Sequence, residues 1–177
     1  MRYHDITTAD MMNGEGLRVV LWLSGCSHHC YNCQNPQTWD VNSGIPFDES
    51  AKEELFRELG KDYISGLTLS GGDPLHEANL DGVLDLVNRF RLSFPNKTIW
   101  IYSGYRWSEI FNDGVYLTKE CAGWKRREIV KNCTVMVDGR YIDSQRNPSK
   151  KWAGSDNQRI IDTRKSLEQN KVVLYCS

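Results

Sequence analysis

Short apolar runs rich in β-branched residues alternate with polar segments along most of the chain. Runs of this length, bounded by turn-forming residues, are typical of buried β-strands. We therefore expect strands in six segments, namely 19–23, 67–69, 98–102, 134–137, 159–161 and 172–175.

Two segments between these runs repeat their apolar residues at helical spacing. The first carries Ala51, Leu55, Phe56 and Leu59 after a cap at Asp48 or Ser50, and Gly60 is placed to end it. The second ends before Pro95, and its apolar positions are Leu80, Val83, Leu84, Val87 and Phe90. Residues 112–132 have no clear period.

Strands that alternate with helices predict an α/β fold with a parallel sheet and helical crossovers. In such folds the functional groups gather in the loops that leave the carboxyl ends of the strands. A chain of 177 residues fits one domain, which we place at 1–177.

Charge and composition narrow the function classes. With 22 Lys and Arg against 23 Asp and Glu, the net charge of −1 predicts no general affinity for nucleic acid or for an anionic membrane. The amino terminus has no basic leader with an apolar core, and no run is long enough to cross a bilayer. We expect a cytoplasmic protein.

Three of the six cysteines, Cys26, Cys30 and Cys33, form a CxxxCxxC motif directly after the first predicted strand. Closely spaced cysteines in a reducing compartment are typical of metal sites. A structural zinc site needs four protein ligands, so it would have to add a histidine from among His4, His28 and His29. An iron–sulfur cluster held by three cysteines keeps one iron open for a substrate, and this reading fits the ligand number better. We expect Cys121, Cys133 and Cys176 to be structural.

Glycines follow two other predicted strands. Ser70–Pro74 has the sequence SGGDP, and its glycines allow a ligand to approach the backbone closely. On local grounds alone the same segment is better explained as a strand-to-helix turn capped by Asp73 with Pro74 starting a helix. YSGY at 102–105 is equally a tight turn at Gly104. Neither His28 nor His29 is assigned a role.

The cysteine motif together with the glycine loop resembles the radical S-adenosylmethionine superfamily. The resemblance implies a single-domain partial (βα)6-type barrel and a 4Fe–4S cluster with three cysteine ligands, Cys26, Cys30 and Cys33. It also implies S-adenosylmethionine as cofactor, with contacts from Asn32, Cys33, Gln34, Gly71, Gly72, Asp73 and Ser103. The superfamily often has Glu where this chain has Asp73.

Longer stretches, among them NGEGLRVVLWLSGC, CQNPQTWDVNSG, VMVDGRY and GSDNQRIID, resemble the anaerobic ribonucleotide reductase activating proteins within the glycyl-radical-activating enzymes. The resemblance implies that the enzyme cleaves S-adenosylmethionine reductively to a 5'-deoxyadenosyl radical. This radical would take a hydrogen atom from the glycyl radical loop of the large reductase subunit. A one-electron donor such as flavodoxin would reduce the cluster. Arg18, Asn35 and Trp39 would shape the cofactor pocket or the partner surface. Residues 112–132 and 162–177 do not fit the pattern, and we treat them as a candidate insertion and a C-terminal extension.

Three alternatives remain at this point. The chain could activate another glycyl radical enzyme, such as pyruvate formate-lyase, by the same chemistry. It could be a radical enzyme that acts on a small molecule, or a non-catalytic binding module stabilised by zinc.

Overall fold

A continuous seven-stranded sheet forms the centre of the computed structural model, which describes residues 1–111, 118 and 121–175. The strand order is β3-β1-β2-β4-β5-β6-β7. The four central strands, β2 (Arg18–Leu23), β4 (Gly66–Gly71), β5 (Thr98–Ser103) and β6 (Val135–Asp138), run parallel. The predicted single-domain α/β fold with a largely parallel sheet is confirmed.

Antiparallel strands flank the parallel ones on both sides. β1 (Arg2–Asp10) pairs with β2, and β3 (Ile45–Pro46) pairs with β1. At the other edge β7 (Arg159–Asp162) pairs with β6. The sequence pattern did not predict β1 or β3, because β1 is largely polar and β3 has only two residues.

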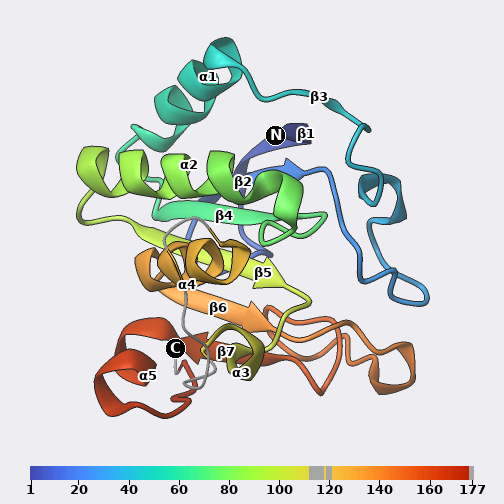
Figure 1. Cartoon of the computed structure of the whole chain (residues 1–177). Coiled ribbons are helices and arrows are strands. Elements are labelled where there is room, and N and C mark those ends of the chain that lie inside the picture. Colours follow the sequence, from blue (N-terminus) through green and yellow to red (C-terminus); the bar gives the residue numbers. More distant parts are fainter. Residues whose placement is uncertain (112–117, 119–120, 176–177) are drawn as a thin grey trace.

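Helices cover one face of the sheet, as Figure 1 shows for α1 (Glu49–Leu59), α2 (Leu80–Ser93) and α4 (Ala122–Asn132). Each lies on the crossover between two parallel strands. The two predicted helices are α1 and α2, and α1 begins at the Asp48 cap and ends at Gly60 as expected. Their apolar faces pack on alternate residues of β2, β4 and β5 in the main hydrophobic core. The remaining helices are α3 (Trp107–Ile110) and α5 (Thr163–Gln169).

The opposite face of the sheet carries a smaller apolar cluster, formed by Trp100, Val135 and Val137 with later parts of the chain. Trp152 and Tyr175 pack edge-on against the Trp100 ring at 4.9 and 5.3 Å. The C-terminal segment therefore completes this face of the domain.

Two expectations about the second half of the chain need correction. Residues 122–132, where the sequence shows no clear period, form the crossover helix α4, which brings the chain from β5 to β6. The segment 172–175 is not a regular strand: only Leu174 forms a bridge, to Ile161, and its side chain is 55% exposed. Residues 112–117 and 119–120 and the expected structural Cys176 lie outside the described residues.

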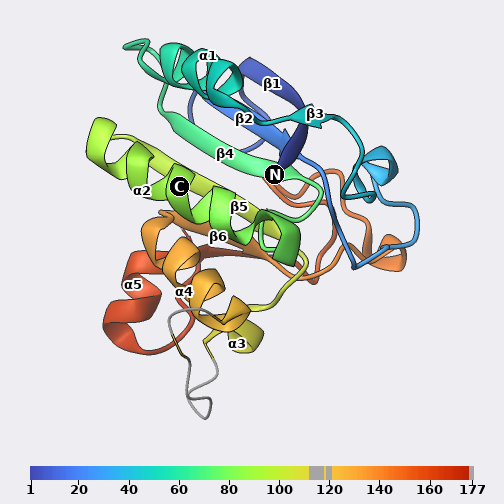
Figure 2. The same ribbon diagram turned by 45° about the horizontal axis from the view of Figure 1, so that its top comes forward.

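The carboxyl ends of the parallel strands all lie at one end of the sheet. In Figure 2 the blue loop after β2 and the orange loop after β6 lie together at that end. Within the described residues, no helix combines the length and apolar character needed to cross a membrane.

Candidate active site

Loops from all four parallel strands line one cavity of about 130 Å³ at the carboxyl ends of these strands. The cavity lies at the edge of the sheet where we expected the functional groups. The lining includes all three cysteines of the motif and most of both glycine segments, namely Cys26, Cys30, Cys33, Gln34, Asn35, Ser70, Gly71, Gly72, Asp73, Tyr102, Ser103 and Gly104, with Gly139, Arg140 and Tyr141 after β6.

The backbone after β2 curls so that all three cysteines line the same cavity. Gly25 adopts φ +97°, and His29 and Asn32 also have positive φ, which is uncommon for residues with a side chain. The N–H of Cys26 donates to the Trp39 carbonyl at 3.0 Å and fixes the start of this cysteine loop, residues 25–35.

Burial raises the pKa of two of the three thiols, Cys26 and Cys30. It raises the pKa of Cys26 to about 11, although the backbone N–H groups of His28 and His29 favour the thiolate. Burial also raises the pKa of Cys30, against the opposing effects of the Tyr141 N–H and the Arg140 charge. A bound cation would reverse this preference, because metals bind and stabilise thiolates. Three thiols in one partly buried cavity therefore suit a metal cluster.

The glycine loop, residues 70–73, lies directly against the cysteine loop. The Gly72 N–H donates to the Leu23 carbonyl and the Asp73 N–H to the Gly25 carbonyl, both at 2.7 Å. A Cβ on Gly72 would lie 2.5 Å from the Gly25 oxygen, and Gly71 has φ +101°. Glycine is needed at both positions for the two loops to approach this closely.

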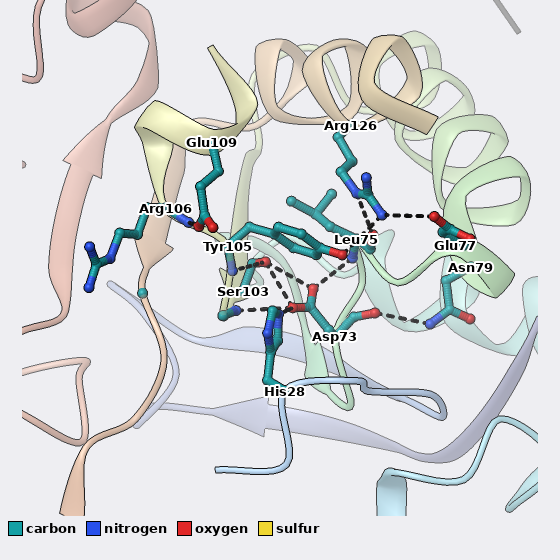
Figure 3. A network of polar contacts seen from close by, with 12 residues as sticks. His28, Asp73, Leu75, Glu77, Asn79, Ser103, Tyr105, Arg106, Glu109 and Arg126 are labelled. Atoms are coloured by element: carbon teal, nitrogen blue, oxygen red, sulfur yellow. Dashed lines mark hydrogen bonds and ion pairs between the residues drawn. The ribbon is translucent and has the colours of Figure 1, made fainter. Parts of the chain in front are cut away.

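Asp73 lines the cavity, yet its carboxylate is occupied by donors from the protein itself (Figure 3). One oxygen accepts from the Leu75 N–H at 2.8 Å, and the other from the Gly104 N–H at 3.0 Å and His28 Nε2 at 2.7 Å. The Ser103 hydroxyl reaches both oxygens, at 2.9 and 3.0 Å. Direct contacts of Asp73 and Ser103 with a cofactor remain predictions, and in this structure both side chains bind each other.

Asn32 and Trp39, which we expected near the cofactor or partner, do not line this cavity. Asn32 is exposed and donates from Nδ2 to Asp143 at 3.2 Å. The Trp39 ring stacks on His29 at 4.8 Å, and its Nε1 is buried without a hydrogen-bond partner among the described residues.

Arg18 contradicts the expected pocket or surface role. It is the first residue of β2, at the end of the sheet opposite the cysteines, and its side chain is fully buried. Its guanidinium donates to the hydroxyls of Thr68 and Thr98 at 2.7 and 2.8 Å and to the Leu67 carbonyl at 2.6 Å. Arg18 therefore ties β2, β4 and β5 together and cannot contact a partner.

Several residues at the site were not predicted from the sequence. His28 contacts Asp73, and the Tyr102 hydroxyl is buried without a partner among the described residues. Two hollows of about 420 and 380 Å³ adjoin the cysteine cavity and share lining residues with it. Residues from distant segments line them, including Arg106, Asn157, Trp22, Trp152 and Gln158. Trp22, Asn157 and Gln158 lie in stretches that resemble the family, but nothing in those stretches places them beside the cysteines, and Arg106 and Trp152 lie in no such stretch.

The three histidines considered as a fourth zinc ligand have other contacts. His28 binds Asp73, His29 stacks on Trp39, and His4 Nε2 lies 2.9 Å from the Ser43 hydroxyl. Among the described residues, no group of three or more His, Cys, Asp and Glu side chains is placed to hold a metal ion, and this applies to Cys26, Cys30 and Cys33 as well as to the histidines. The choice between an iron–sulfur cluster and zinc therefore rests on the comparison with known proteins.

Comparison with known proteins identifies the family. Residues 12–161 match the model of the 4Fe-4S single cluster domain. The anaerobic ribonucleoside-triphosphate reductase-activating protein of Escherichia coli K12 is 38% identical over 162 residues, which cover 90% of this chain and 97% of that protein. The protein of the same name from Enterobacteria phage T4 is 40% identical over 161 residues, or 90% and 93% of the two chains. This chain therefore belongs to the family of anaerobic ribonucleoside-triphosphate reductase-activating proteins.

Proposed function

We propose that this protein is a radical S-adenosylmethionine enzyme that generates a glycyl radical on the large subunit of an anaerobic ribonucleotide reductase. The observation that carries the proposal is the cavity at the carboxyl edge, which brings Cys26, Cys30 and Cys33 together with the glycine loop. Family membership supports the choice of the reductase over pyruvate formate-lyase or a small-molecule substrate.

In this proposal Cys26, Cys30 and Cys33 would hold the 4Fe–4S cluster. When bound, the cluster would supply one chemistry, the one-electron reductive cleavage of S-adenosylmethionine that leads to removal of a hydrogen atom from a reductase glycine. The protein orients the reacting groups and shields them from water. Gln34, Asn35 and the glycine-loop backbone line the same cavity and are our candidates for contacts with the cofactor.

One of the two adjoining hollows is suited to admit the glycyl radical loop of the reductase. The hollow of about 380 Å³ meets the cysteine cavity at Gln34, Ser70 and Tyr102, and it extends to the exposed Met12. It offers a path by which the glycyl radical loop of the reductase reaches the cavity. A one-electron donor such as flavodoxin, and a cytoplasmic location where thiolates stay reduced, complete the proposal.

Cleavage of S-adenosylmethionine by anaerobically reconstituted, dithionite-reduced protein tests the chemistry. We expect methionine and 5'-deoxyadenosine in equal amounts from the wild type and none from Cys30→Ser. Cys121→Ser is the matched control, because Cys121 caps α4 outside the cavity and serine is a good helix cap. Cluster-loaded wild type that leaves S-adenosylmethionine intact, or a Cys30→Ser variant that still cleaves it, would refute the proposal.

A further inference from the structure

We propose that His28 is a positioning residue that holds the cysteine loop against the glycine loop through Asp73, and thereby sets the environment of the cluster and the affinity for S-adenosylmethionine. The inference rests on the proposed function for the identity of these cofactors. His28 lies in the spacer between Cys26 and Cys30 and is not a metal ligand in the proposed function. The inference gives it a separate role.

The His28 side chain is buried although it belongs to a loop at the edge of the domain. Only 6% of it is exposed, and Nε2 lies 2.7 Å from the Asp73 carboxylate. The edge of the ring packs on Tyr105, with ring centres 4.8 Å apart. The next residue, His29, is exposed and has no contact with Asp73, so the two adjacent histidines differ in their environment.

Asp73 connects His28 to the loops that follow two other strands (Figure 3). Backbone N–H groups can only donate, and those of Leu75 and Gly104 reach opposite oxygens of the carboxylate. Asp73 therefore accepts at both oxygens, and His28 must donate from Nε2. The contact joins residues 45 positions apart and links the loops after β2, β4 and β5 in one network.

The position of His28 in turn determines the surroundings of a proposed cluster ligand. His28 lies two residues from Cys26 in the same loop, so its anchor acts on the backbone that surrounds the Cys26 sulfur. Hydrogen bonds to cluster sulfurs are among the factors that set the reduction potential of an iron–sulfur cluster. Release of the His28 side chain from Asp73 would free the backbone of the cysteine loop and change the donors near this sulfur.

Gly104 supplies the space that the His28 ring occupies. A Cβ added to Gly104 would lie 2.2 Å from His28 Cδ2, so alanine there must displace the ring. We interpret the glycine of YSGY as the residue that admits His28, in addition to its place in a turn. Gly104→Ala is therefore a second way to disturb the anchor while His28 itself is unchanged.

The test compares reconstituted holoprotein carrying His28→Leu, His28→Gln or Gly104→Ala with the wild type. His29→Leu is the matched control, since it removes the neighbouring ring without touching Asp73. We expect His28→Leu to raise the S-adenosylmethionine concentration for half-maximal cleavage by about 10- to 100-fold, as for other residues that orient metal ligands. The reduction potential and the paramagnetic resonance spectrum with S-adenosylmethionine should shift as well.

Rescue separates an anchoring hydrogen bond from simple packing. Gln places a donor near the position of Nε2, so His28→Gln should regain most of the affinity. Gly104→Ala should change the affinity in the same direction as His28→Leu, and His29→Leu should match the wild type. A His28→Leu variant with wild-type half-saturation, potential and spectrum would overturn the inference.

Hydrogen–deuterium exchange of iron-free protein tests the anchor without any cofactor. The amides of residues 25–35 should exchange faster in His28→Leu than in the wild type or His29→Leu. If wild-type holoprotein cleaves no S-adenosylmethionine, the proposed function fails while this exchange result still decides the anchor. Equal exchange in all three proteins would refute the anchor even where cleavage is normal. If His28→Leu does not fold, Gly104→Ala carries the same measurements.

Discussion

Replacement of the buried Arg18 by methionine should destabilise the protein more than replacement of any exposed arginine. The guanidinium makes five hydrogen bonds, to the Thr68 and Thr98 hydroxyls and to the carbonyls of Glu15, Leu67 and Thr98. It also lies 5.5 Å from the centre of the Trp100 ring. Methionine keeps the apolar stem and loses every one of these bonds.

The expected magnitude follows from two opposing effects. Five hydrogen bonds at roughly 1 to 1.5 kcal/mol each contribute about 6 kcal/mol. Burial of the charge opposes this, since it lowers the pKa of Arg18 from 12.5 to about 10, a cost of roughly 3 kcal/mol. We therefore expect Arg18→Met to lower the free energy of unfolding by about 3 kcal/mol, and Tm by roughly 6 to 12 °C for a chain of this size.

Urea and thermal unfolding of the iron-free protein measure the effect. Arg164→Met is the control, because the Arg164 side chain is 85% exposed and pairs with Glu168 one helical turn away, which is worth about 0.5 kcal/mol at most. A loss below about 1 kcal/mol for Arg18→Met would refute the reasoning. Normal stability combined with lost cleavage would return Arg18 to the functional role that the sequence analysis gave it.

Three further predictions concern the core and the cavity. Burial raises the pKa of Cys133 from 9.0 to about 12, so between these pH values the folded protein keeps a proton that the unfolded chain loses. Urea titrations between pH 9 and 12 should therefore show the wild-type free energy of unfolding falling by about 1.4 kcal/mol per pH unit more than that of Cys133→Ala. Equal slopes for the two proteins would contradict this. Gly72→Ala should reduce cleavage of S-adenosylmethionine about 100-fold by forcing the two loops apart, whereas the helical Gly82→Ala should keep it; equal rates would refute the close-approach argument. Tyr102→Phe removes a buried hydroxyl without a described partner and should raise the free energy of unfolding of the iron-free protein by about 1 kcal/mol; a loss of stability would mean that the hydroxyl has a partner.

Local patterns were sufficient to predict the parallel strands and the first two crossover helices. The cysteine motif was also predictable, because its spacing and its place after a buried strand are both local. In contrast, β1 is a polar strand beside β2, and α4 buries only Ile129 and Val130 in its second half. Their patterns are too weak to distinguish them from loops, and tertiary packing determines them.

Contacts between distant segments account for most of what the sequence did not reveal about the site. Arg18 is buried and hydrogen-bonded to two neighbouring strands, because strands that begin about 50 and 80 residues later place Thr68 and Thr98 beside it. His28 and Asp73 are each unremarkable in their own motifs and acquire a joint task only where the two loops meet. A single sequence carries no signal for such pairs.

Anaerobic incubation with an anaerobic ribonucleotide reductase is the most direct test of the central claim. Reduced, cluster-loaded protein, S-adenosylmethionine and the large reductase subunit would be mixed, and the product examined by electron paramagnetic resonance. The account predicts the doublet of a glycyl radical on the reductase with the wild-type protein and no signal with Cys30→Ser. Cleavage of S-adenosylmethionine without a radical on the reductase would contradict the proposed partner.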